Sequence, residues 1–124
     1  MANSEAYEKL KKETGLNKDS GKLRVDLVPV SAIKAIAEVL GDACKPGPNG
    51  EPPKYPERNW QKGINYSRVY ANIQRHLLDW FDGKDKDAES GLHPLKHAIC
   101  RLSMLVEFVD KNMEEFDDRP NKSV

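Results

Sequence analysis

Cysteine is scarce in this sequence of 124 residues, which contains only Cys44 and Cys100. The two residues form neither a CxxC motif nor a cysteine-rich framework, so a disulfide scaffold is not expected. We predict two reduced thiols, with Cys100 in the core and Cys44 near a loop. The alternative, a redox or nucleophilic cysteine, would need an electropositive and exposed setting.

Long apolar runs and an excess of charge are also missing. No run of 18 apolar residues and no signal-peptide pattern occurs, so we expect no membrane segment and a cytoplasmic location. The 20 basic and 20 acidic residues give a formal net charge of zero, which offers no electrostatic argument for a general nucleic-acid binder. Walker A, GxGxxG and GxSxG motifs are absent, so P-loop, Rossmann and hydrolase-elbow chemistry have no support.

The length suits one domain with one hydrophobic core. We expect a flexible, lysine-rich arm over residues 1–21, a main domain over 22–116, and a disordered tail over 117–124. Because 32% of the residues are charged, the core is expected to be completed by assembly into a homo-oligomer.

Apolar residues at helical spacing predict three helices, and no β-hairpin signal is present. The first runs from Ser31, as its N-cap, to Gly41, after an extended stretch at 22–29. The second covers about 67–83 and the third about 93–116. The predicted fold is therefore a single-domain, all-α bundle. The residues expected in its core are Leu40, Leu77, Trp80, Ile99 and Leu102.

A proline-rich loop is expected at residues 45–56, which contain five prolines and two glycines. Such a composition is incompatible with a helix or a central strand. Long loops in compact domains are usually functional or disordered.

An acidic connection at residues 82–91 links the second and third predicted helices. It places Asp85, Asp87 and Glu89 within five residues of one another. Magnesium and manganese prefer several such oxygen ligands. A solvated turn is the alternative, and the spacing does not match an EF-hand loop.

Three histidines form a second group. His93 and His97 are four residues apart, at which spacing two imidazoles on one helix face can share a metal, although no HExxH motif is present. An incidental pair is the alternative. His76 could equally be a half-buried histidine between helices.

Basic and aromatic residues surround the proline-rich loop and the second predicted helix. Arginine forks match phosphate oxygens, and Trp60 and Tyr66 could stack on a base. The alternatives are ordinary surface charges and core aromatics, with Trp60 packed under the loop. The basic residues are Lys22, Arg24, Lys45, Lys54, Arg58, Lys62, Arg68 and Arg75.

The order of three motifs adds a family resemblance. RNWxKG lies at 58–63, RHLLxW at 75–80 and DxESGL at 87–92. From about Lys22 to Asp110 the chain resembles the phage dATP/dGTP diphosphohydrolase family, of the N-terminal-domain type linked with MazG-like nucleotide pyrophosphohydrolases. The resemblance implies an oligomeric all-α protein of a phage-infected or prophage-bearing bacterium. It also implies Mg²⁺- or Mn²⁺-dependent cleavage of a purine deoxynucleoside triphosphate to monophosphate and pyrophosphate.

The resemblance also implies roles for residues of this chain. Asp87, Glu89 and His97 are expected to be catalytic. Asp87, Glu89, His76 and Asp85 are the expected metal ligands. The expected phosphate-binding residues are Arg24, Arg58, Lys62 and Arg75, and Trp60 and Tyr66 are the candidates for contact with the base.

Three positions depart from the family pattern: Lys84 replaces an acid, Pro94 a histidine, and Arg101 an asparagine. A lysine beside a metal would repel the cation. The alternative function is therefore a catalytically inactive module of the same fold that sequesters a nucleotide immune signal, as in phage anti-defence. A purely structural helical protein is the third interpretation.

Overall fold

The computed structural model describes residues 4–13, 15–16 and 18–122. Within these ranges the regular structure is helical and contains no strand, which confirms the all-α prediction. The elements are α1 (Ser4–Glu13), η1 (Val25–Leu27), α2 (Val30–Cys44), η2 (Asn59–Lys62), α3 (Tyr66–Phe81), α4 (Pro94–Asp110) and η3 (Glu114–Phe116), where η denotes a 3₁₀ helix.

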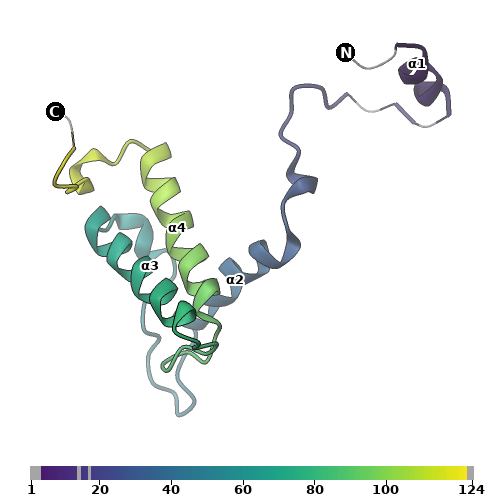
Figure 1. Cartoon of the computed structure of the whole chain (residues 1–124). Helices are drawn as coiled ribbons and strands as arrows, with labels where there is room; N and C mark the ends of the chain where they lie inside the picture. Colours follow the sequence, from purple (N-terminus) through teal and green to yellow (C-terminus); the bar gives the residue numbers. More distant parts are fainter. Residues whose placement is uncertain (1–3, 14, 17, 123–124) are drawn as a thin grey trace.

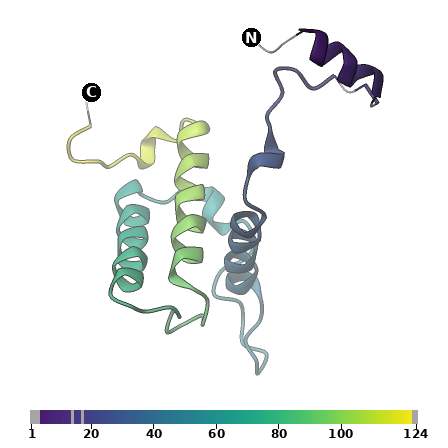
Figure 2. The same cartoon turned by 45° about the vertical axis from the view of Figure 1, so that its right-hand side comes forward.

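Helix α4 lies between α2 and α3 and packs against both, whereas α1 lies apart from the other helices (Figures 1 and 2). Two ring contacts show that α3 and α4 are antiparallel. Tyr66, at the start of α3, stacks on Phe108 near the end of α4, and His76, near the end of α3, stacks on His97 near the start of α4. A short connection therefore suffices to join the two helices.

The core is centred on Phe108, which is fully buried. Its ring lies 6.0 Å from Trp60 and 6.2 Å from Tyr66, measured between ring centroids. Val69 and Cys100 are also fully buried beside it. Aromatic packing thus joins η2 to both α3 and α4.

The predicted core was partly wrong. Leu40 and Ile99 are half-buried, but Leu77, Trp80 and Leu102 are 38%, 42% and 50% exposed. Helix α4 has apolar residues on two faces, and the face that packs contains Ala98, Met104 and Phe108. Periodicity identifies a helix but does not decide which of two apolar faces is covered.

The helix ends also differ from the prediction. Helix α2 begins at Val30 after Pro29, so Ser31 lies inside it and is not its cap. The helix continues past Gly41 to Cys44, because a single glycine costs only about 1 kcal/mol in a helix. Helix α4 ends at Asp110, and Asn112 then takes a left-handed φ of 55°.

The described part of the expected disordered tail, residues 117–122, contacts the start of α3. The backbone N–H of Ser67 donates a 2.8 Å hydrogen bond to Asp118 Oδ1, and the Ser67 hydroxyl donates to Asp118 Oδ2. These bonds hold the pKa of the Asp118 carboxyl below its ordinary value. Asp118 therefore supplies the N-terminal cap that α3 lacks locally, since Asn65 makes no side-chain cap bond.

Both cysteines are free thiols, as predicted. Cys100 is buried in the core, and its burial raises the pKa of the thiol. Cys44 is half-buried at the end of α2, next to the proline-rich loop. Among the described residues, no helix has the length and apolar character needed to cross a membrane.

The second apolar face of α4 gives a prediction about assembly. Leu102, Val106 and Val109 are 50%, 63% and 63% exposed. Because such a stripe normally packs against a partner, we expect the wild-type chain to sediment as a homo-oligomer and Val106→Lys/Val109→Lys to sediment at lower mass with unchanged helicity. Asp110→Lys, at an exposed polar position, is the control. A monomeric wild-type chain would contradict this prediction.

Candidate functional site

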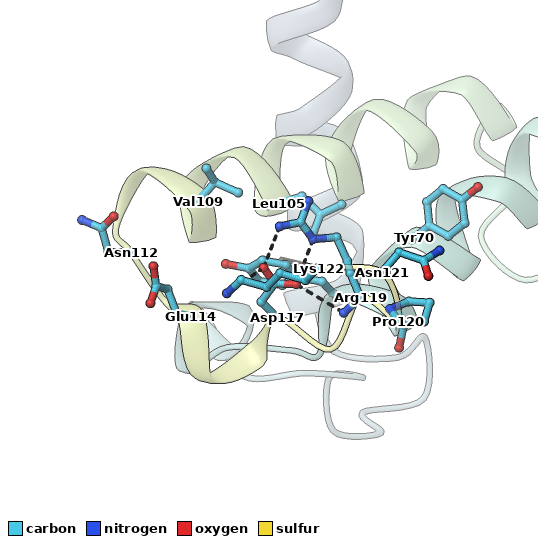
Figure 3. A pocket seen from close by; sticks show the side chains of 12 residues that line it. Tyr70, Leu105, Val109, Asn112, Glu114, Asp117, Arg119, Pro120, Asn121 and Lys122 are labelled. Atoms are coloured by element: carbon cyan, nitrogen blue, oxygen red, sulfur yellow. Dashed lines mark hydrogen bonds and ion pairs between the residues drawn. The ribbon is translucent and has the colours of Figure 1, made fainter. Parts of the chain in front are cut away.

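Two hollows in the described part of the chain are candidate ligand sites. The larger, of about 1180 Å³, is bounded by α2, α3, α4 and the proline-rich loop. The smaller, of about 740 Å³, lies beside the start of α3 and the C-terminal segment (Figure 3). Either volume can hold a small molecule. The charged residues that line each hollow therefore show which of the two is better suited to a ligand.

The smaller hollow has its positive charge neutralised internally. Arg119 and Lys122 both reach Asp117, at 2.8 Å and 3.3 Å between nitrogen and carboxylate oxygen (Figure 3). These partners hold the pKa of the Asp117 carboxyl well below its ordinary value. An incoming phosphate would have to compete with a carboxylate that is already bound.

The arginines that line the larger hollow are not neutralised in this way. Arg58, Arg75 and Arg101 line it, and within the described residues none of them forms an ion pair with a carboxylate. Arg101 is half-buried, and its nearest recorded polar contact is Met104 Sδ at 4.0 Å. A half-buried guanidinium without a counter-ion is costly, so an anionic ligand would stabilise this arrangement.

Two histidines and one aspartate lie together in the same hollow. The rings of His76 and His97 are stacked, with centroids 4.6 Å apart. Asp87 Oδ1 lies 3.9 Å from His76 Nδ1, and Asp87 Oδ2 lies 3.9 Å from His97 Nε2. One carboxylate therefore faces imidazoles from both α3 and α4.

Backbone hydrogen bonds fix the Asp87 side chain. Its Oδ2 accepts from the N–H groups of Glu89 at 3.1 Å and Ser90 at 2.9 Å. Burial alone would raise the pKa of the Asp87 carboxyl, but these bonds and the nearby His97 outweigh it, so the pKa lies below its ordinary value. Asp87 is therefore an ionised carboxylate at neutral pH.

The two imidazoles are neutral at the same pH. Burial lowers the pKa of His76 below 6.5, and the neighbouring His97 lowers it further. Burial also lowers the pKa of His97, and the opposing effect of Asp87 is too small to restore it. Neutral imidazoles can accept a proton or bind a metal ion.

Ser90 positions His97. Its hydroxyl oxygen lies 2.6 Å from His97 Nε2 and accepts a 3.1 Å hydrogen bond from the Leu92 N–H. Ser90 and Asp87 approach the same ring nitrogen, so the three residues do not form a Ser-His-Asp triad, in which serine and aspartate contact opposite nitrogens.

Local sequence explains the shape of the connection. Helix α3 ends in a Schellman turn, with Gly83 at a φ of 94° and a Lys84 N–H to Asp79 carbonyl bond of 3.0 Å. Gly91 has a φ of 75°, which lets its N–H bond the Asp87 carbonyl at 2.8 Å. The two glycines fold the connection back over His76.

Most of the predicted site residues meet in the larger hollow. Glu89 is at its rim, paired with Lys54 at 2.7 Å. Trp60 packs on Phe108, in line with the packing role considered for it, and it also lines the hollow, where contact with a base stays a prediction. The predicted residues that line the hollow are Arg58, Trp60, Arg75, His76, Asp87, Glu89 and His97.

Four predicted residues lie elsewhere. Arg24 pairs with Asp26 at 2.8 Å on an exposed part of the chain, and Lys62 is exposed on η2 outside the hollow. Asp85 pairs with His93 at 3.3 Å. Tyr66 is buried in the core, where its hydroxyl donates to the Met113 carbonyl at 3.2 Å.

The predicted site left out three lining residues that bear on the chemistry of the hollow. Asn72 precedes His76 by one turn of α3, so helical spacing from His76 was a usable signal. Arg101 follows His97 by one turn of α4 in the same way. Ser90 belonged to the DxESGL motif but had no assigned role.

The carboxylate in the hollow is a chemically suitable ligand for a divalent cation, although the side chains around it do not provide a complete set of metal ligands. Among the described residues, no three His, Cys, Asp or Glu side chains form a group able to hold a metal ion. However, Asp87 is ionised. Mg²⁺ is commonly bound by one or two carboxylates together with substrate phosphates, so this carboxylate fits a cation that enters with a nucleotide.

The larger hollow combines arginines that have no carboxylate partner among the described residues with neutral histidines and an ionised carboxylate. Such a combination is typical of a site for a phosphorylated ligand. Residues 12–119 match the family model described as dATP/dGTP diphosphohydrolase, N-terminal, and the chain belongs to this family. It is 33% identical over 106 residues to a protein of Salmonella phage PMBT28 named dATP/dGTP diphosphohydrolase.

That alignment covers 86% of the chain and 33% of the phage relative, so the chain spans about a third of the relative's length. No solved structure matches the chain. The family is thus assigned from sequence, and the arrangement of the hollow comes from the structure of the chain itself.

The stacked histidines give a prediction about pH. Because folding lowers the pKa of both imidazoles, the unfolded chain binds more protons than the folded chain once the pH falls below about 6.5. The contribution of the two neutral imidazoles to the free energy of unfolding is therefore complete above this pH. It is lost as the pH falls toward the pKa values of the folded state. We expect urea unfolding to give a smaller free energy at pH 5 than at pH 7, and His97→Gln to reduce this difference. An equal pH dependence in the variant would contradict the assignment.

Proposed function

We propose that the chain binds a purine deoxynucleoside triphosphate in the larger hollow and takes part in its cleavage to monophosphate and pyrophosphate with Mg²⁺ or Mn²⁺. The observation behind this proposal is the placement of three arginines without counter-ions around the His76, Asp87 and His97 cluster. Membership of the diphosphohydrolase family supports the reaction class.

The arginines would bind the phosphates. Arg58, Arg75 and Arg101 approach the hollow from the loop, α3 and α4, so their donors surround it from three elements. Guanidinium forks bind phosphate oxygens in pairs and stabilise the charge that develops during phosphoryl cleavage.

Asp87 would hold the divalent cation together with the triphosphate, since it is ionised and its position is fixed by two backbone N–H groups. A bound cation would neutralise phosphate charge and lower the pKa of a water molecule. His97 is neutral and its Nε2 lies 2.6 Å from the Ser90 hydroxyl oxygen, so this imidazole would be placed to accept a proton during hydrolysis. Stacking on His76 keeps the His97 ring in place.

Lys84, one of the departures from the family pattern, does not enter the hollow. Its ammonium is exposed and lies 3.5 Å from Asp79 Oδ1. Pro94 is buried at the first position of α4, where proline suits a helix. The third departure, Arg101, adds a cation to the hollow. These positions support an active site, because none of them places a positive charge in contact with Asp87.

Incubation with each deoxynucleoside and ribonucleoside triphosphate, with Mg²⁺ or Mn²⁺, tests the proposal by chromatography of the products. We expect monophosphate and pyrophosphate from dATP or dGTP. Asp87→Ala should lower the rate at least about 100-fold, in line with the loss of a metal-binding carboxylate. Asp85→Ala, outside the hollow, is the matched control and should retain the wild-type rate.

The alternative function is a module that binds the nucleotide without cleaving it. The absence of a three-ligand metal group among the described residues favours it. Unchanged nucleotide that remains bound to the wild-type chain would support this module and contradict the hydrolase.

A further inference from the structure

One buried side-chain oxygen, on a residue that lines the larger hollow, has no hydrogen-bond partner in the described part of the chain. Asn72 Oδ1 is buried, and within the described residues it is a side-chain acceptor without a hydrogen bond. A buried polar group left unsatisfied costs about 1–3 kcal/mol, so native structures normally satisfy it with protein, water or ligand. Asn72 lines the hollow, where a ligand could supply the missing donor.

The two ends of the hollow differ in chemistry. The ring contacts place His76 beside His97 at one end of the α3–α4 pair and Tyr66 beside Phe108 at the other. Asp87, Ser90 and the histidines give the first end its polar groups. The lining residues that also pack in the apolar cluster of Tyr66 and Phe108 include Val39, Trp60, Ile64 and Met104.

Asn72 lies on α3 between these ends, one turn before His76. Its oxygen is an acceptor, so it repels phosphate oxygens, which are acceptors too. A nucleoside instead offers donors: the exocyclic amine or ring N–H of a purine, and the 3′-hydroxyl of the sugar. The unpartnered oxygen therefore marks a position for the nucleoside rather than for the phosphates.

We infer that Asn72 Oδ1 accepts a hydrogen bond from an N–H or O–H group of the nucleoside, so that the base lies toward Trp60 and the triphosphate toward His76 and His97. This inference depends on the proposed function, because it assigns an orientation to the same ligand. Asn72 is thus a binding residue that selects nucleotides by their donors. A buried acceptor discriminates against analogues that lack the matching donor.

The test is a double-mutant cycle on binding, with calorimetry and three α,β-imido nucleotides as probes. The first is the dATP analogue, the second lacks the 6-amino group, and the third lacks the 3′-hydroxyl. For the wild-type chain we expect one of the two deletions to weaken binding about fivefold to tenfold, as for one net hydrogen bond. Asn72→Ala should weaken binding of the dATP analogue to the same degree and abolish the effect of that deletion.

The analogue that responds identifies the donor as the base amine or the sugar hydroxyl, and either supports the inference. Gln74→Ala is the matched control, because Gln74 is an amide on the same helix that bonds Tyr70 outside the hollow. It should bind all three probes as the wild type does. Thermal unfolding of both variants separates lost binding from lost folding.

Two other outcomes contradict the inference in different ways. If the probes bind but Asn72→Ala weakens all three equally, or none of them, Asn72 does not accept from the nucleoside and only this inference fails. If neither these probes nor the α,β-imido analogue of dGTP binds to the folded wild-type chain, the proposed function fails and this inference fails with it.

Discussion

The position of the Asp87 carboxylate is the constraint on which the candidate site depends. Two backbone N–H groups of its own turn hold it, and imidazoles from α3 and α4 lie 3.9 Å from its oxygens. Because the connection is short, this turn also sets how the ends of the two helices meet. The backbone hydrogen bonds and His97 lower the pKa of Asp87 and leave it ionised, whereas burial keeps both imidazoles neutral against the opposing effect of the carboxylate. One local arrangement thus gives both the shape and the protonation states of the hollow.

The walls of the hollow around Asp87 are held in place by contacts that lie farther from this carboxylate. Phe108 joins Trp60 and Tyr66 in the core and so fixes η2 against α3 and α4. The Tyr55 N–H bonds the Ala43 carbonyl, and Lys54 pairs with Glu89, so the proline-rich loop is tied to α2 and to the acidic connection. The loop is therefore a wall of the hollow, and Arg58 enters the hollow from it.

The helices and much of the site could be predicted from sequence, because helical spacing and short motifs are local signals. Asp87 and His76 belong to the DxESGL and RHLLxW motifs, and the structure brings both beside His97, while their catalytic and metal-binding roles stay predictions. The covered face of α4 could not be predicted, since its apolar residues form two stripes and only tertiary packing selects between them. Nor could sequence show that Asp85 pairs with His93, that Tyr66 is buried in the core, or that Arg101 faces the hollow without a counter-ion.

The nucleotide is proposed to enter the larger hollow and not the one beside Asp117. An NMR titration of the ¹⁵N-labelled chain with a non-hydrolysable dATP analogue and Mg²⁺ distinguishes the two hollows. We expect chemical-shift changes centred on Asn72, His76, His97 and the Arg101 guanidinium. Shifts confined to Ser67, Arg119 and their neighbours, or no shifts at saturating nucleotide, would contradict this proposal.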